Sequence, residues 1–444
     1  QKSFANKAKE TLGGIKENKA GVIFNFKLYF LLLLTAGLLI KSFEFTFFLS
    51  LFTIVLIILF TKNLVSKNLI NLITFLIIPL LIAATVGIFS KQSEYDYFKD
   101  LAYLTKPILF IFIGYVTTRK IDDKNFIFKT IILTGFIFSV LHLMKVLKYI
   151  ITTNDFSIHG LRGFAGLGNE VELIAICLII LNIKKKIIDL KNSNLMLVII
   201  GISLILYFSR TTAFTFFLVL MAILGYMKLT KKGLKYSFFL LFSIASIYFY
   251  LFSIDIPRNS DNALDSFLYK LKIAPSEVFL SKGSLDINDH DKLWDSWRAY
   301  ESSVAIKQIV SEPATNILFG LGAGSLIDLG FFAPLSDNNS DGMRYISILH
   351  NGYVYIFCKS GVIGLMFYII FLIKILSTFG FKNKNFITSN ILFGLGIYFL
   401  LSSFVIAGIY NLHDPLSLLI GAYLRNFEIE KNENRNIRHL KDSL

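Results

Sequence analysis

Runs of about twenty apolar residues recur along the whole chain, and this recurrence constrains the fold more than any other feature. A helix needs a stretch of this length to cross the hydrocarbon core of a bilayer. The composition agrees, because 55% of the 444 residues are hydrophobic and only 17% are charged, whereas ordinary globular chains carry roughly 25% charged residues. The sequence excludes a cytoplasmic enzyme, a disulfide scaffold and a disordered tail. It predicts an all-α polytopic integral membrane protein.

About twelve transmembrane helices are expected, each bounded by charged or turn residues. They are predicted at residues 22–40, 45–61, 69–90, 101–118, 125–147, 169–183, 194–209, 212–227, 236–254, 346–373, 387–406 and 412–424. The run 346–373 is longer than one crossing requires, so we expect a part-helix that enters the membrane before a full crossing. The predicted organisation is a basic N-terminal segment (1–21), helices 1–9 (22–254), a large polar loop (255–345), helices 10–12 (346–424) and a basic tail (425–444).

The basic residues behind the formal net charge of +15 indicate how the chain is oriented in the membrane. Most of the lysines, including Lys184, Lys185 and Lys186, fall in short loops on the side that also holds both termini. The positive-inside rule makes this side cytoplasmic, so both termini lie inside and the loop 255–345 lies outside. That outer loop has thirteen acidic residues against eight basic ones. The charge therefore gives no indication of a nucleic-acid partner.

An amphipathic helix is predicted within the outer loop, over residues 291–310. Its apolar residues follow a 4-3-4 spacing, at Leu293, Trp297, Tyr300 and Val304. This spacing places them on one helix face, which would lie against the bilayer or over a cavity. A turn-rich GLGAGS segment follows at 320–325.

Arginine is scarce in the chain, with nine residues against thirty-six lysines, and five of the nine are predicted on the outer side. These five are Arg162, Arg210, Arg258, Arg298 and Arg344. Arg210 stands at a membrane edge between two apolar runs, where an ionised guanidinium needs an anionic partner. Either it reaches lipid headgroups or a carboxylate such as Glu170 or Glu172, or it binds a phosphate-bearing ligand. Arg162 lies in a glycine-rich segment that fits either a plain turn or a phosphate-cradling loop.

His350 is the histidine most suited to chemistry, because it stands where the outer loop re-enters the membrane. A neutral imidazole there can accept a proton, although a purely interfacial histidine fits the spacing equally well. We expect His413 and Asp414 to cap a helix end. No two histidines have metal-ligand spacing on one helix face, and the two cysteines lie in apolar runs, so neither a metal site nor a disulfide is expected.

These residues together predict a group of cations and one histidine at the outer membrane edge. Such a site suits a lipid-anchored phosphate or pyrophosphate. The arginines would neutralise charge on a leaving pyrophosphate, and the histidine would help a sugar hydroxyl to attack.

Four segments resemble, in order, motifs of the O-antigen polymerase and O-antigen ligase superfamily of bacterial inner-membrane glycosyltransferases. They are Arg162–Asn169, Ser209–Thr211, Trp297–Ala299 followed by Pro313 and Gly320–Gly324, and His350–Asn351 followed by Gly361 and Gly364. The resemblance covers roughly residues 160–365. It implies a GT-C-like enzyme that transfers a glycan from undecaprenyl pyrophosphate to a hydroxyl group on the periplasmic face, without metal or other cofactor.

The resemblance also implies roles for particular residues. His350 and Arg210 would be catalytic, and the group that binds pyrophosphate or substrate would comprise Arg162, Arg210, Lys292, Arg298, Arg344 and Asn351. Lys292 stands five positions before Trp297, where the family has arginine. Either Lys292 acts there as a point charge, or Arg298 takes over. The implied partners are membrane lipids, a carrier-linked oligosaccharide and a chain-length regulator.

Three functions remain open at this point. A polymerase accepts another carrier-linked repeat unit, and a ligase accepts lipid A–core. The abundance of Ile, Phe, Lys and Asn indicates AT-rich coding, which favours the polymerase. A flippase or transporter is the alternative from another class, but it would be expected to show internal repeats and ionisable residues near the midplane.

Overall fold

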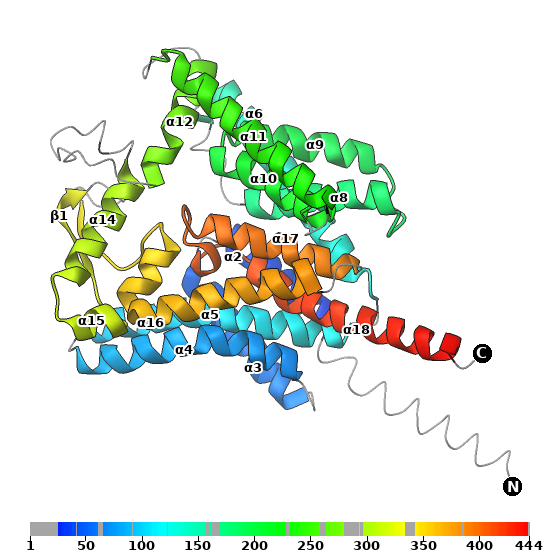
Figure 1. The fold of residues 1–444 in the computed structure, drawn as a ribbon, viewed down its shortest axis with the longest axis horizontal. Helices are drawn as coiled ribbons and strands as arrows, with labels where there is room; N and C mark the ends of the chain where they lie inside the picture. Colours follow the sequence, from blue (N-terminus) through cyan, green and yellow to red (C-terminus); the bar gives the residue numbers. More distant parts are fainter. Residues whose placement is uncertain are drawn as a thin grey trace, which may run out of the picture.

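The computed structural model describes residues 25–40, 42–60, 65–90, 92–121, 123–155, 160–161, 168–227, 231–257, 263–278, 293, 296–333, 342–382 and 386–442. Helix predominates in these ranges, in agreement with the predicted class (Figure 1).

A helix lies at each of the twelve predicted spans. These helices are α2 (Phe26–Leu39), α3 (Phe43–Phe60), α4 (Lys67–Phe89), α5 (Glu94–Arg119), α6 (Phe126–Thr153), α8 (Asn169–Lys185), α9 (Ser193–Leu206), α10 (Arg210–Ile223), α11 (Lys231–Ser253), α16 (Gly352–Ile375), α17 (Ile387–Ser402) and α18 (Leu416–Asp442). Within the described ranges, α4, α5, α6 and the run Gly352–Gly380 are long and apolar enough to cross a membrane on their own. That all twelve segments cross stays a prediction.

Two features differ from the sequence prediction. The outer loop contains a two-stranded antiparallel hairpin, β1 (Ile327–Ala333) and β2 (Met343–Ile346), in which Asp328 lies opposite Tyr345. The segment predicted as a basic tail continues the helix α18, which runs without interruption to Asp442.

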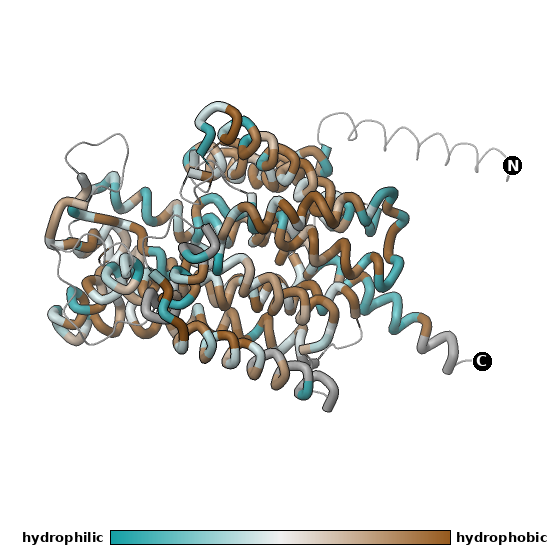
Figure 2. Tube along the Cα trace, turned by 90° about the horizontal axis from the view of Figure 1, so that it is seen from above, coloured by the Kyte–Doolittle hydropathy of each residue, from teal (hydrophilic) through white to brown (hydrophobic). Residues whose placement is uncertain are grey.

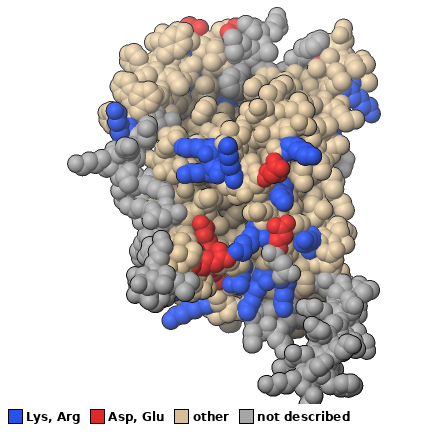
Figure 3. All heavy atoms as spheres, turned by 90° about the vertical axis from the view of Figure 1, so that its right-hand side faces the viewer, with Lys and Arg blue, Asp and Glu red and all other residues tan. Residues whose placement is uncertain are grey.

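The helices lie side by side along the long axis of the molecule (Figure 1). Hydrophobic residues fill the middle of the bundle and hydrophilic residues gather toward its ends (Figure 2). One end carries the outer-loop helices α14 (Trp297–Val310) and α15 (Ala314–Phe319) together with β1; α12 (Ala263–Val278) leads down to them from α11. The opposite end displays many Lys and Arg side chains (Figure 3). This separation agrees with the charge asymmetry, while the orientation in the membrane stays a prediction.

Glycines allow α5 and α18 to approach closely. A Cβ atom at Gly114 would lie 2.0 Å from the carbonyl oxygen of Leu418, and one at Gly421 would lie 1.9 Å from that of Ile111. Small residues of this kind let helix backbones meet in membrane proteins, where packing replaces the hydrophobic driving force.

The helix α16 is broken at Gly361, whose backbone angles are φ 66° and ψ −168°. The break leaves the carbonyls of Cys358 and Lys359 free to accept from the backbone N–H groups of Leu321 (2.7 Å) and Gly322 (3.2 Å). The glycine-rich segment of the outer loop is thereby attached to the bundle. The break divides α16 into two parts, as the predicted part-helix followed by a crossing requires; that the second part crosses the membrane stays a prediction.

Candidate functional site

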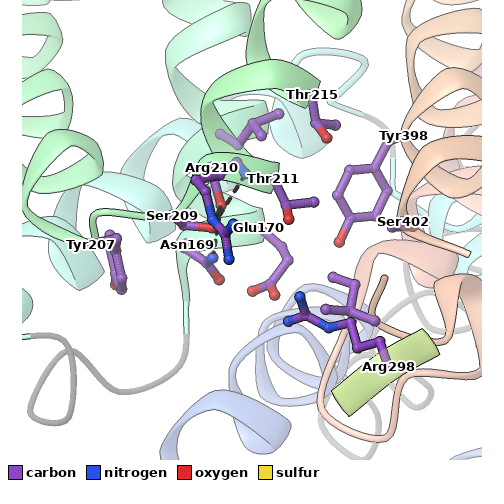
Figure 4. Close-up of a pocket in the computed structure, with 13 residues that line it drawn as sticks. Asn169, Glu170, Tyr207, Ser209, Arg210, Thr211, Thr215, Arg298, Tyr398 and Ser402 are labelled. Atoms are coloured by element: carbon purple, nitrogen blue, oxygen red, sulfur yellow. Dashed lines mark hydrogen bonds between the residues drawn. The ribbon is translucent and has the colours of Figure 1, made fainter. Parts of the chain in front are cut away.

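A polar pocket of about 200 Å³ lies where the N-terminal ends of α8 and α10 meet α17 and α14 (Figure 4). Arg210 and Arg298, which are distant in sequence, both line it. The other polar residues around it are Asn169, Glu170, Tyr207, Ser209, Thr211, Thr212, Thr215, Tyr398 and Ser402. Two of the predicted pyrophosphate-binding cations therefore share one cavity.

The turn between α9 and α10 places Arg210 at the pocket. Phe208 adopts a positive φ of 46°, which ends α9 and reverses the chain. Ser209 then caps α10, because its Oγ accepts from the backbone N–H of Thr212 at 3.3 Å. The side-chain amide of Asn169 donates to the hydroxyl of Thr212 at 3.1 Å and so ties the start of α8 to the start of α10. Arg210 itself donates to the backbone carbonyl of Lys270 on α12.

More basic than acidic side chains line the pocket. Two guanidinium groups face one carboxylate, that of Glu170, which lies between Arg210 and Arg298 in Figure 4. The N-terminal ends of α8 and α10 add partial positive charge from their unpaired N–H groups. Arginine and helix N-termini are the groups that proteins use for phosphate. The lining therefore favours a ligand that carries negative charge.

The wall opposite α10 is held by a buried polar network. Tyr398 donates its hydroxyl to Asp414 at 2.8 Å, and Asp414 also accepts from the backbone N–H of Leu416 at 2.8 Å. The ammonium group of Lys106 donates to the carbonyls of Asn411 (2.9 Å) and Leu412 (2.6 Å) and to that of Asp414 (3.1 Å). The helix-end cap expected at this position is confirmed for Asp414.

An apolar groove of about 730 Å³ adjoins the pocket, along α8, α9 and α10. Its walls include Ile176, Ile205 and Phe217, and it shares Ser209 and Thr212 with the polar pocket. Ile205 is 70% exposed and Phe217 is 57% exposed. These helices are predicted to lie in the membrane, so the groove is expected to face the lipid.

His350 forms a dyad with Glu301, beside the pocket rather than in it. Glu301 follows Arg298 by three residues on α14, so the two side chains are neighbours on one helix. The Glu301 carboxylate lies 2.8 Å from Nδ1 of His350 and also accepts from the His350 backbone N–H at 3.1 Å. The Glu301 side chain is 3% exposed and that of His350 is 47% exposed. A carboxylate oxygen accepts hydrogen bonds, so the tautomer of a neutral imidazole that fits this contact has its proton on Nδ1 and leaves Nε2 as the acceptor.

The remaining predicted site residues lie elsewhere or outside the described part of the chain. Asn351 caps α16, since its side-chain oxygen accepts from the backbone N–H groups of Tyr353 (3.0 Å) and Val354 (3.2 Å). Arg344 binds Asp328 with two parallel hydrogen bonds of 2.8 Å across the hairpin. Arg162 and Lys292 lie outside the described residues.

The ion pair between Arg344 and Asp328 has an electrostatic consequence. The hydrogen bonds from Arg344, together with one from the backbone N–H of Gly330, lower the pKa of Asp328 to about 2. In this geometry both carboxylate oxygens of Asp328 are bound to Arg344. The structure thus gives Arg344 a role in holding the hairpin together, in addition to the substrate contact predicted from sequence.

Sequence reasoning missed Glu301, Tyr398 and Ser402. A signal for Glu301 was present, because an acidic residue in the middle of an amphipathic helix needs a partner if that part of the helix is buried. Tyr398 and Ser402 lie within an apolar span, where they resemble ordinary helix residues, and gave no such signal.

The fold is that of a mostly helical protein with apolar helices long enough to cross a membrane, and its polar pocket is lined by two arginines. Residues 195–369, from α9 through most of α16, match the family model described as O-antigen ligase. This match over part of the chain is consistent with the O-antigen polymerase and O-antigen ligase superfamily, and it agrees with the resemblance seen in the motifs. Members of this family are glycosyltransferase-like enzymes of lipopolysaccharide biosynthesis. No curated protein matches the chain.

Proposed function

We propose that this protein is an O-antigen polymerase. It transfers a growing glycan from undecaprenyl pyrophosphate to a sugar hydroxyl of another carrier-linked repeat unit, on the periplasmic face of the inner membrane. The observation that carries the proposal is the polar pocket with Arg210 and Arg298, which shares the lining residues Ser209 and Thr212 with a neighbouring apolar groove. A ligand with an anionic head and a long apolar chain fits this pair of cavities.

In this proposal the pocket binds the leaving group. Arg210 and Arg298 neutralise the charge that develops on the pyrophosphate, assisted by the N-terminal ends of α8 and α10. The polyprenyl chain lies in the groove along α9 and α10. Arg162 and Lys292 remain predicted as further cations of the same site.

In the proposed reaction, the dyad of His350 and Glu301 takes up the proton that the acceptor hydroxyl loses. The acceptor hydroxyl oxygen forms a bond to the anomeric carbon while the bond from that carbon to the pyrophosphate oxygen breaks, and its electron pair leaves with the pyrophosphate. The hydroxyl proton passes to Nε2 of His350. Glu301 holds the ring in the required tautomer through the 2.8 Å contact with Nδ1 and stabilises the imidazolium that forms.

A ligase is the second candidate, because the matching family model is described as O-antigen ligase. It would use the same donor chemistry and differ only in its acceptor, lipid A–core. The abundance of Ile, Phe, Lys and Asn, which indicates AT-rich coding, favours the polymerase.

One reconstitution separates the candidates. The purified protein in lipid nanodiscs is given carrier-linked repeat units alone, or together with lipid A–core. A ladder of longer carrier-linked glycans supports the polymerase, and transfer to lipid A–core without a ladder supports the ligase. In sealed vesicles, movement of the carrier-linked sugar without any new glycosidic bond would instead identify a flippase and overturn both proposals.

Arg210→Ala tests the pocket in the same assay. We expect a loss of about 10²–10³-fold in turnover, since each donor to a developing oxyanion contributes on this scale. Arg435→Ala is the matched control, because Arg435 is exposed near the far end of α18. Full activity in Arg210→Ala would contradict the assignment of this residue to pyrophosphate.

A further inference from the structure

A second polar groove, of about 560 Å³, lies on the outer-loop end of the molecule. It is formed where the end of α4 and the start of α5 meet the end of α14, α15 and β2. Its polar lining includes Gln92, Gln308, Glu312, Asn316, Ser325 and Tyr345, together with Ser90 at the end of α4. None of these residues belongs to the pocket that holds Arg210 and Arg298.

The floor of this groove is firmly attached to the bundle. A buried ion pair joins Lys359 on α16 to Asp100 on α5 at 2.5 Å, and the same ammonium group donates to the backbone carbonyl of Ser325 at 2.5 Å. Asp100 also accepts from the backbone N–H of Gly324 at 2.7 Å. The loop below the groove is therefore fixed by charge-assisted bonds as well as by its backbone contacts with α16.

The wall contributed by α14 is equally fixed. The side-chain amide of Gln308 donates to the carbonyl of Leu326 at 3.0 Å and accepts from the backbone N–H of Asp328 at 3.0 Å. These bonds connect the helix to the first strand of the hairpin. A groove with a held floor and wall can bind a ligand without ordering its own chain first.

The chemistry of the lining favours a saccharide. Amide and hydroxyl groups both donate and accept hydrogen bonds, as sugar hydroxyls do. Tyr345 is 52% exposed, and the guanidinium of Arg344 lies over its ring, 5.6 Å from the ring centre; the partial negative charge of the other aromatic face attracts the C–H bonds of a sugar ring. Among the described residues that line the groove there is no lysine or arginine, and Glu312 adds a negative charge, so a phosphate group is disfavoured.

The helix α14 connects the two sites. Arg298 lies near its start in the cationic pocket, and Gln308 lies near its end in the polar groove. The ten-residue separation corresponds to about 15 Å along a helix, a distance that a few linked sugars span. We propose that this groove binds the glycan chain a few sugars away from the bond being made; the inference rests on the proposed glycan transfer.

Tyr345→Ala tests the groove through its dependence on glycan length. The apparent KM is measured for donors that carry a single sugar and for donors that carry several repeat units. We expect the variant to raise KM for the long donors about tenfold, the scale of one aromatic contact, and to leave KM for the single-sugar donor and kcat for both donors unchanged. Phe332→Ala is the matched control, because Phe332 is a 64% exposed aromatic residue of the same hairpin that is not among the residues lining the groove. Equal KM values for the long donors in Tyr345→Ala and the wild type would overturn the proposal.

A binding measurement separates this inference from the proposed reaction. Free glycan, released from its carrier and fluorescently labelled, is titrated onto the full protein in nanodiscs. Wild type and Arg210→Ala should bind it equally and Tyr345→Ala about tenfold more weakly. If no transfer is observed but this pattern holds, the proposed reaction fails and the groove stands. If transfer is observed but free glycan does not bind, or binds Tyr345→Ala as tightly as the wild type, the groove proposal is wrong.

Discussion

The buried carboxylate of Glu301 accepts both the backbone N–H of His350, at 3.1 Å, and its ring nitrogen Nδ1, at 2.8 Å. This double contact fixes the ring of a half-exposed histidine that follows it by forty-nine positions in sequence. A carboxylate that orients an imidazole is a recurring device of proton-transfer sites.

Substitution of Glu301 should affect turnover more than binding. We expect Glu301→Gln to lower kcat about 10–100-fold, because the ring loses its orienting carboxylate, and to leave KM for the donor nearly unchanged. His350→Ala should cost more. The double variant Glu301→Gln/His350→Ala should be no slower than His350→Ala alone, since the two residues act as a unit. Additive losses in this cycle would show that Glu301 acts independently of His350.

Arg298 should be coupled to Arg210 through their common anion. We expect Arg298→Ala to lower kcat/KM about 10²-fold and Arg298→Lys to recover part of the loss, because lysine keeps the charge but loses the bidentate fork. The double variant Arg210→Ala/Arg298→Ala should lose less than the product of the single losses if both contact one pyrophosphate. A strictly multiplicative effect would place the two arginines on separate groups.

The hairpin should be sensitive to acid through Asp328. Its pKa of about 2 in the folded protein lies below the ordinary value of 3.8. The pairing with Arg344 therefore stabilises the folded protein at any pH above the ordinary pKa of 3.8. This contribution disappears as the pH falls toward 2. Asp328→Asn should lower the thermal unfolding temperature at pH 7 and match the wild type more closely at low pH.

Arg344→Ala distinguishes the two roles of this arginine. If its guanidinium mainly holds the hairpin, Arg344→Ala and Asp328→Asn should give the same unfolding temperature at pH 7. Both should also leave KM for a single-sugar donor unchanged. A raised KM in Arg344→Ala alone would support the substrate contact that the sequence predicts.

The buried pair of Asp100 and Lys359 should be intolerant of single substitutions. The two side chains are 0% and 2% exposed, and removal of one partner leaves the other charge buried and unpaired. We expect Lys359→Met to destabilise the protein by about 3–5 kcal/mol. The double variant Asp100→Asn/Lys359→Met should recover part of this loss, as measured by thermal unfolding in detergent. A double variant less stable than Lys359→Met would contradict the pairing.

The contact between α5 and α18 should not tolerate a methyl group. Gly421→Ala would bring a Cβ to 1.9 Å from the Ile111 carbonyl oxygen, so the helices must separate. We expect a loss of about 1–3 kcal/mol in unfolding free energy. Gly201→Ala is the control, since the nearest atom would be 3.9 Å away, and it should unfold like the wild type.

The helix positions were predictable because each depends on a local run of apolar residues. The hairpin was not, because its strands are short and its main ion pair joins Asp328 to Arg344 across the sheet. The length of α18 was also missed, since the polar residues after Leu424 indicate the end of a membrane span and say nothing about the end of a helix.

The site was predictable only where a residue is unusual for its place in the chain. Arg210 and Arg298 were found because arginine is scarce and both are on the predicted outer side. Tyr398 gave no signal in the sequence, and the position of Glu301 on an amphipathic helix indicates only that it needs a partner; which neighbours the two residues have depends on the folded chain. His350 was identified, but its place beside the pocket follows from its tertiary contact with Glu301.

A single helix, α14, bears Arg298, Glu301 and Gln308, and this limits how such a protein can diversify. Rotation of the helix by one residue, about 100°, would displace all three side chains together. The proposed leaving-group contact, the carboxylate that orients His350 and the proposed glycan groove would be lost in one step. In the proposed enzyme, new sugar preferences are therefore expected to arise by substitution in the hairpin and in α15. Side chains there can change while α14 keeps its orientation.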